Sequence, residues 1–431
     1  MNPYSIFALV LSAYYFIKFF NALTKKIAFT ELILVIYSVN YLFSPAILYS
    51  YNEKLVLYKL KLTPDNYFPI AIISILALHI GMSIKKVKIF EINFNMLKLE
   101  SLLNERMLKQ WVIVGSILTF LQGNVYSELS FFIYLTSQIR YIGALGLTSI
   151  NFKKNILYIV IPFLLEIYNS IIGAMFADTS VWLMFFVIFV FYIKKPHFII
   201  KFTILGFSIV SLIALQISKN DYRERTWRGT EAASLSTLKQ SFESSQKGEN
   251  TESYFSDNKI INTLTRFNQS WILMSTIKNM DEKKDFQSYS LIILYLKSAL
   301  LPRFLAPDKL NSGDKEIFNR FSGHTISSGT AMGLGILADG YISFGKVGII
   351  IFSFVLGLIF SLIFYIVSKW ALISPFFILF SLPILNYAIR PDCETQTLLG
   401  NLVKSLFVYS ILVSYYKYSF NKKIVLKSSL V

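Results

Sequence analysis

Long apolar stretches recur from one end of this chain to the other. Each approaches the roughly 20 residues that an α-helix needs to cross a bilayer. Only 16% of the 431 residues are charged and 54% are hydrophobic, whereas soluble domains carry roughly 25% charged residues. The sequence therefore predicts an all-α polytopic membrane protein. About eleven transmembrane helices are expected, at residues 4–23, 29–51, 66–84, 110–123, 129–150, 156–174, 179–193, 198–218, 346–368, 371–389 and 396–416.

The lysines of the short loops predict the orientation of these spans, because basic loops stay on the cytoplasmic side. Every second loop is basic, which predicts a periplasmic N-terminus and a cytoplasmic C-terminus. The first run lacks a preceding basic residue and a small-residue cleavage site, so we expect a retained span and no signal peptide. The basic loops carry Lys25, Lys26, Lys85, Lys86, Lys88, Lys153, Lys154, Lys194, Lys195, Lys369, Lys417, Lys422, Lys423 and Lys427.

One long segment interrupts the pattern of short loops. Residues 219–345 are expected to form a large outer loop between a first group of spans (1–218) and a last group with a cytoplasmic tail (346–431). The loop begins as a Ser-, Thr- and Glu-rich stretch. From Ile260 onward apolar residues return at helical spacing, which predicts helices on or dipping into the membrane. Loops of this length are often functional.

Composition and motifs exclude several functional classes. The net charge of +17 is explained by the cytoplasmic rim, and no nucleic-acid-binding module is recognisable. Cys393 is the single cysteine, and the three histidines are scattered, so we expect no metal site and no cofactor. No nucleotide-binding loop is present. The absence of an internal repeat disfavours an inverted-repeat transporter.

Arginine is distributed unevenly between the two sides. Lysine and arginine together number 42, of which nine are arginines, and seven of these nine fall on the expected outer side. The planar guanidinium group binds phosphate through two hydrogen bonds and stays charged. These residues therefore predict an anion site beside the membrane, although single members are also explained as solvated loop charges. The seven are Arg223, Arg225, Arg228, Arg266, Arg303, Arg320 and Arg390.

The stretch LYLKSALLPRFLAPDK, from Leu294 to Lys309, marks one edge of that site. Pro302 and Pro307 are expected to end the apolar helix, which places Arg303 and Lys309 at the headgroup level. We expect both cations to bind a phosphate-linked lipid headgroup together with the arginines at 223, 225, 228, 266 and 390.

Two opposite charges occupy the middle of neighbouring predicted spans. Arg140 and Glu166 each lie thirteen residues from Lys153, near the centre of the turn between those spans. Two antiparallel helices bring them to the same depth, where unpaired charges are costly. We predict an ion pair with a structural role or a place on the substrate path.

The motif LPRFLAPDK, followed by GLGILADGYISFGKVGIIIF, resembles the outer-loop signature of the Wzy-type O-antigen polymerases, which are bacterial oligosaccharide repeat-unit polymerases. The topology is similar too, and the resemblance covers roughly residues 220–365. Where many relatives have Glu, this chain has Asp339. The Arg-to-Gly spacing of some members is also missed by one residue between Arg303 and Gly313.

The resemblance implies transfer of a growing glycan from its undecaprenyl diphosphate carrier onto a new repeat unit, at the outer face of the inner membrane. No metal is needed when arginines stabilise the departing diphosphate. Asp339 and His324 are the candidate catalytic bases; alternatively, Asp339 caps a helix and His324 is a plain loop residue. A polysaccharide chain-length regulator is a further expected partner. An O-antigen ligase and a lipid-linked oligosaccharide flippase remain alternatives.

Overall fold

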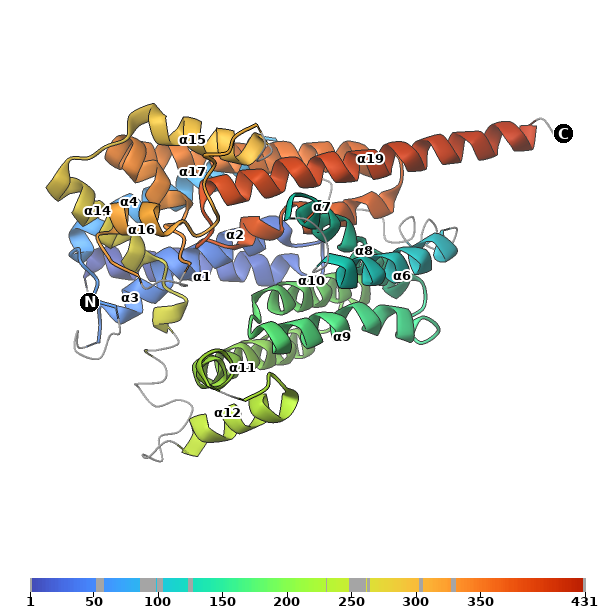
Figure 1. The fold of residues 1–431 in the computed structure, drawn as a ribbon, viewed down its shortest axis with the longest axis horizontal. Coiled ribbons are helices and arrows are strands. Elements are labelled where there is room, and N and C mark those ends of the chain that lie inside the picture. The colour runs from blue at the N-terminus through green and yellow to red at the C-terminus, as the bar shows by residue number, and fades with distance from the viewer. Residues whose placement is uncertain are drawn as a thin grey trace.

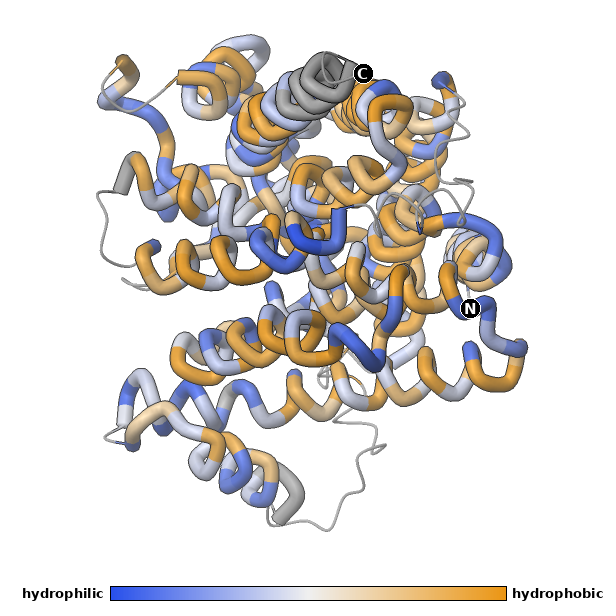
Figure 2. The backbone as a smooth tube through the Cα atoms, turned by 90° about the vertical axis from the view of Figure 1, so that its right-hand side faces the viewer, coloured by the Kyte–Doolittle hydropathy of each residue, from blue (hydrophilic) through white to orange (hydrophobic). Residues whose placement is uncertain are grey.

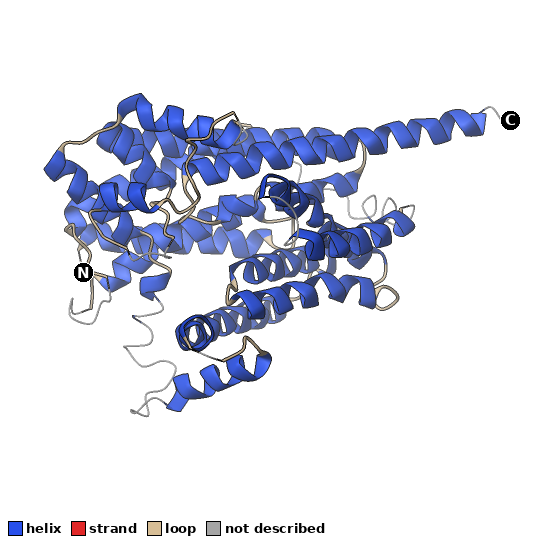
Figure 3. Cartoon of the chain, viewed as in Figure 1, coloured by secondary structure: helices blue, strands red, loops and turns tan. Residues whose placement is uncertain are grey.

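The computed structural model consists of helices and connecting loops, with no strand in the part that it describes (Figure 3). Eight of the described helices are long and apolar enough to cross a membrane by length and composition. The chain is therefore a helical membrane protein. The structure describes residues 2–51, 58–85, 98, 104–122, 127–229, 231–247, 261, 264–301, 305–326 and 331–428.

The helices of the first half of the chain, up to α11, follow one another in sequence. The N-terminus lies at one end of the assembly, and the long α19 carries the C-terminus away at the other (Figure 1). The bounds are α1 (Pro3–Ala22), α2 (Phe29–Ser38), the π-helical turn η1 (Val39–Phe43), α3 (Ser44–Leu48), α4 (Pro64–Ser83), α6 (Glu105–Leu121), α7 (Ser127–Ser137), α8 (Ile139–Ile150), α9 (Ile156–Gly173), α10 (Ala177–Lys194), α11 (Phe198–Arg223) and the π-helical turn η4 (Glu224–Arg228).

The second half alternates short helices with two long ones. Hydrophobic residues run along the helices, and hydrophilic residues gather in the connections and at the ends (Figure 2). The bounds are α12 (Leu235–Lys247), α14 (Ser270–Lys283), α15 (Ser288–Leu300), α16 (Lys315–Ser322), α17 (Ile336–Ala371), the 3-10 helix η5 (Pro375–Phe380), α18 (Ser381–Ile384), the 3-10 helix η6 (Asn386–Ile389) and α19 (Thr395–Ser428).

The helices α4 and α17 pack along each other at the centre of the bundle. They cross where Gly81 meets Gly357: a Cβ atom at Gly357 would lie 2.3 Å from the carbonyl oxygen of Leu78. Membrane helices gain little from burying apolar surface against one another, so small residues that allow close backbone contact favour their association. The glycine pair therefore fixes this crossing.

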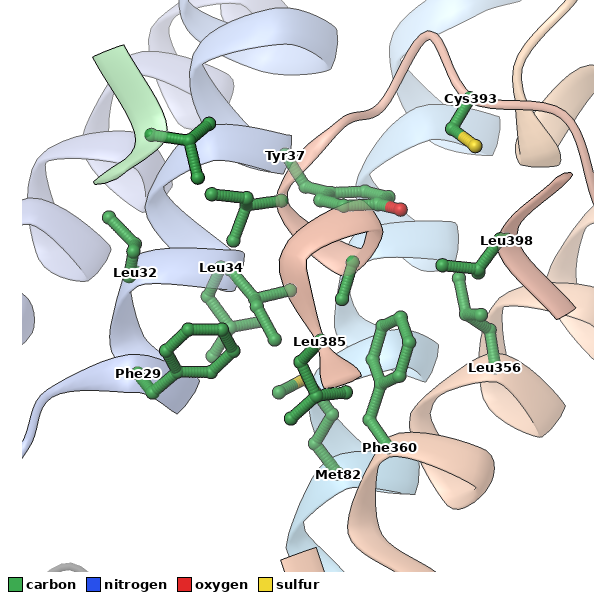
Figure 4. Close-up of a cluster of buried hydrophobic side chains, with 14 of the residues drawn as sticks. Phe29, Leu32, Leu34, Tyr37, Met82, Leu356, Phe360, Leu385, Cys393 and Leu398 are labelled. Atoms are coloured by element: carbon green, nitrogen blue, oxygen red, sulfur yellow. The ribbon is translucent and has the colours of Figure 1, made fainter. Parts of the chain in front are cut away.

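Buried side chains from four parts of the chain fill the space beside that crossing (Figure 4). Phe29 and Tyr37 come from α2, Met82 from α4, Phe360 from α17 and Leu398 from α19, and each is at most 5% exposed. This shared core joins the first helices of the chain to the last two long ones.

The helix α17 contains a sharp bend that divides it into a short first part and a long second part. Phe344 and Gly345 leave the helical conformation, and Gly345 has φ 62° with ψ −145°, a combination that essentially only glycine adopts. The first part folds back on the second so closely that a Cβ atom at Gly348 would lie 2.2 Å from the Gly340 carbonyl oxygen. The segment from 346 onward corresponds to the span expected at 346–368.

The span expected at 371–389 is wrong. This segment forms η5, α18 and η6, three short pieces that are almost entirely buried. Pro375 and Pro383 remove backbone donors, and irregular backbone is tolerated at membrane depth where protein surrounds it. Asn401 of α19, for example, donates its amide to the Ile384 carbonyl at 3.0 Å. The segment is apolar because it is buried in the protein core.

Three further expectations differ in detail. The run 129–150 is divided at Gln138 into α7 and α8, and α6, expected at 110–123, is a 17-residue helix. The helix α14, expected at the membrane surface, is instead buried along most of its length. The helix α15 does expose an apolar face, formed by Tyr289, Ile293, Leu296 and Leu300.

Candidate functional site

Two adjoining hollows lie between the beginning of α14 and the beginning of α19. The first has a volume of about 240 Å³ and contains Arg266 and Gln269 in its wall. The second, of about 250 Å³, contains Arg390 and Glu394. Both include Gly333 and Asp392, so they share one wall. They form a single cleft with two compartments.

The shared wall depends on glycine. A Cβ atom at Gly333 would lie 2.3 Å from the carbonyl oxygen of Asp392. No other residue fits there without moving the backbone, and this contact presses the segment before α17 against the segment before α19. The cleft is therefore built from two tightly apposed loops.

Arg266 lines the first hollow, and two further cations lie close enough to interact with it. Lys219 and Arg223 lie at the end of α11, and Arg266 precedes α14. Lys219 is repelled by both arginines and attracted by Asp392, and Arg223 and Arg266 repel each other. Lys219 and Arg266 have no hydrogen-bond or ion-pair partner among the residues that the structure describes. Three cations with one nearby carboxylate keep a net positive charge, which favours binding of an anion.

Arg223 is held in a defined position within that set. Its Nε donates to the carbonyl oxygen of Ala174 at 3.0 Å, and its guanidinium carbon lies 4.4 Å from the ring centroid of Trp227. The hydrogen bond from Nε and the contact with the Trp227 ring hold the Arg223 side chain in place. The two terminal nitrogens have no hydrogen-bond partner among the described residues.

The other expected anion ligands are distributed differently. Arg225 is 2.8 Å from Asp221 and 3.1 Å from Glu231, so its charge is already paired. Arg228 is exposed and lines neither hollow. Lys309 donates to the Leu301 carbonyl at 3.3 Å and lines neither hollow. Arg303 lies outside the described residues.

Arg390 lines the second hollow, where it forms an ion pair with Asp178 at the start of α10. Its guanidinium carbon also lies 4.7 Å from the ring centroid of Tyr387. Arg390 therefore ties α10 to the loop before α19. Arg390 thus lines the cleft, but its charge is already paired with Asp178.

Asp339 is completely buried. One carboxylate oxygen accepts the Tyr295 hydroxyl at 2.8 Å, and the other accepts the backbone N–H of Thr395 at 3.0 Å. Its own helix begins at Ile336, so Asp339 does not cap that helix. It caps α19 instead, and it joins α15, α17 and α19.

His324 stands behind the first hollow. Its Nε2 lies 3.0 Å from the Ser275 hydroxyl, and its ring meets the edge of Trp271 with centroids 5.4 Å apart. Burial, together with the nearby Lys61 ammonium, lowers the pKa of His324. The histidine is thus neutral near pH 7 and supports Trp271, whose other neighbour is the stacked ring of Tyr58 at 4.1 Å.

Sequence reasoning missed Glu394, which is 4% exposed and lines the second hollow. Burial raises the pKa of its carboxyl to about 7, against the hydrogen bond that Gly313 donates, and Asp339 and Asp314 add to the rise. Lys219 and Asp392 were missed as well. Their only sequence signal is position: each stands within a few residues of an outer-side arginine.

Arg140 and Glu166 form an ion pair with Arg140 Nη2 2.7 Å from Glu166 Oε2. The Tyr141 hydroxyl donates to the same carboxylate oxygen at 2.7 Å, and the Tyr141 ring stacks on Trp182 with centroids 3.9 Å apart. Neither residue lines the cleft. The pair is a packing element between α8 and α9.

Residues 69–370 match the model of a protein family described as a domain of unknown function, DUF8712. The match covers more than two thirds of the chain and includes the three cations and Asp339. Arg390, Asp392 and Glu394 lie beyond it. No curated protein and no solved structure matches the chain significantly. The chain therefore belongs to the DUF8712 family.

Proposed function

We propose that this protein is a metal-independent membrane glycosyltransferase that polymerises undecaprenyl-diphosphate-linked oligosaccharide repeat units into O-antigen or a related surface polysaccharide. The observation that carries the proposal is the cluster of Lys219, Arg223 and Arg266, of which Arg266 lines the first hollow. A diphosphate brings the negative charge that this cluster lacks. The similarity of the ADGYISFG region to Wzy-type polymerases supports the same reading.

The proposed reaction is one glycosyl transfer. The bond between the anomeric carbon and the diphosphate oxygen breaks, and its electrons leave with the diphosphate. A hydroxyl of the new repeat unit bonds to that carbon and loses its proton. Cations that stabilise the departing charge lower the barrier to this step.

The cellular setting follows from the same proposal. The protein spans the bacterial inner membrane, with the N-terminus and residues 219–345 on the periplasmic side and the C-terminus in the cytoplasm. The lipid carrier approaches from the bilayer, where the exposed apolar face of α15 lies against acyl chains. A chain-length regulator is a further proposed partner.

Loss of the gene tests the function directly. Lipopolysaccharide from the deletion strain should carry a single repeat unit in place of a ladder on a gel. An O-antigen ligase leaves the lipopolysaccharide core bare when it is lost, and a flippase leaves the repeat unit on the cytoplasmic side. A complete ladder from the deletion strain would refute the polymerase assignment.

A further inference from the structure

The second hollow contains one carboxylate whose surroundings suit proton transfer. Three donors converge on the same oxygen of Glu394: Gly313 N at 3.0 Å, Gln396 Nε2 at 2.8 Å and Thr397 Oγ1 at 3.5 Å all contact Oε2. The other oxygen, Oε1, has no partner among the described residues, yet it is not an enclosed atom. Oε1 therefore faces the hollow.

Asp339 does not offer an equivalent atom. Both of its oxygens accept hydrogen bonds, from Tyr295 and Thr395, and the residue is 0% exposed. It also lines neither hollow. Of these two carboxylates, only Glu394 lines the cleft.

We infer that Glu394 is the general base of the proposed glycosyl transfer and that the second hollow holds the acceptor sugar. This inference rests on the function proposed above. The first hollow and its cations hold the donor diphosphate, so the anomeric carbon lies at the shared wall formed by Gly333 and Asp392. As the acceptor oxygen bonds to that carbon, its proton passes to Glu394 Oε1, and the electrons of the broken bond leave with the diphosphate. Glu394 then releases the proton to solvent.

The ionisation of Glu394 matches this role. Burial raises the pKa of its carboxyl to about 7, so the group is basic enough to accept a proton and still largely ionised at slightly alkaline pH. The charged and titratable groups that face it are Asp339 of α17, Asp314 ahead of α16, Tyr295 of α15, Cys393 of its own loop, and Arg390 and Asp392 across the same hollow.

The test uses the full-length protein in lipid nanodiscs and a lipid-linked repeat unit extracted from cells that lack the gene. Glu394→Gln should lower the polymerisation rate about 100-fold or more with less than a twofold change in KM. The wild-type rate should rise with pH and level off above about 7, whereas the residual rate of E394Q should lack this rise. Glu316→Gln, an exposed carboxylate on α16, is the control and should behave as the wild type.

Three results would overturn the inference. An E394Q protein that keeps more than about a third of the wild-type rate removes the need for this base. A wild-type rate that stays flat between pH 5.5 and 8.5 does so even if E394Q folds poorly. A wild-type protein that binds the lipid-linked repeat unit but forms no polymer refutes the proposed function itself. This outcome concerns the wild type alone, so it is distinguishable from the other two.

Discussion

The carboxylate of Asp339 on α17 accepts the backbone N–H of Thr395, the first residue of α19, at 3.0 Å. A helix begins with N–H groups that lack intrahelical partners, and here a side chain from another helix supplies one. Because the same carboxylate accepts the Tyr295 hydroxyl, it fixes the start of α19 relative to α15. Glu394 immediately precedes that start, so Asp339 positions the residue that we assign as the base.

Substitution of Asp339 should separate this role from catalysis. Asp339→Ala leaves two buried donors without an acceptor, at a cost of about 1–3 kcal/mol each, and should lower the melting temperature and the rate together. Asp339→Asn keeps an oxygen for Thr395 and an amide for the Tyr295 oxygen, so both should stay near wild type. A D339N protein that melts normally but forms no polymer would make Asp339 the base.

Removal of one charge of the Arg140–Glu166 pair should destabilise the protein more than swapping the two charges. Arg140 is 2% exposed, and its Nε and Nη1 have no partner among the described residues. Glu166→Gln removes the charge that pairs with Arg140 and should destabilise the protein by about 3–5 kcal/mol. The double variant R140E/E166R should recover part of this loss in the melting temperature of detergent-solubilised protein. Equal stability of E166Q and wild type would contradict the argument.

Glu394 should make stability depend on pH. Its pKa rises from the ordinary 4.5 to about 7 on folding, so the folded state binds the proton more tightly. The resulting stabilisation is complete below pH 4.5 and is lost as the pH rises through 7, by about 3 kcal/mol in total. The melting temperature of the wild type should fall between pH 5 and 8 more steeply than that of E394Q. If the melting temperatures of the two proteins changed in parallel with pH, the raised pKa of Glu394 would be contradicted.

Hydropathy predicts most of the helices but does not distinguish lipid from protein as their surroundings. It locates α1, α4, α9 and α10, and the start of α19, to within a few residues. It fails at residues 371–389, because a segment enclosed by other helices is as apolar as one that faces lipid. It also places α14 at the membrane surface, although its apolar residues face α17 and α16.

The candidate site was only partly predictable for a related reason. The outer-side bias of arginine indicates an anion site, but which arginines meet depends on how α11 returns toward α14. Arg223 and Arg266 come together, while Arg225 is neutralised by Asp221 and Glu231. Glu394 carries no local pattern of its own. Its role emerges only where the Gly333 segment closes over the loop before α19.

The orientation can be measured with reporter fusions. Alkaline phosphatase is active outside the cytoplasm, and green fluorescent protein is fluorescent inside it. Fusions near residues 95 and 425 should give cytoplasmic signals, and a fusion near residue 250 should give a periplasmic one, because basic loops remain inside. A cytoplasmic signal at 250 would place the cationic cluster on the wrong side for the proposed substrate.

Removal of the clustered cations should stop chain growth without unfolding the protein. Arg223→Ala and Arg266→Ala each remove a group that stabilises the departing diphosphate, and loss of one such group costs about 10²–10³ in rate. Lysine at either position should restore only part of the rate, because a point charge replaces two parallel hydrogen bonds. Arg303→Ala belongs in the same series because of its place after the apolar run ending at Leu301.

Arg320→Ala is the matched control for that series. Arg320 is also an outer-side arginine, but it is exposed and pairs with Asp285 at 2.9 Å, away from both hollows. Its loss removes the same charge from the same side of the protein, so a general electrostatic effect would appear there too. We expect R320A to polymerise at the wild-type rate in nanodiscs and to give a full ladder in cells. A full ladder from the double variant R223A/R266A would show that the diphosphate binds elsewhere.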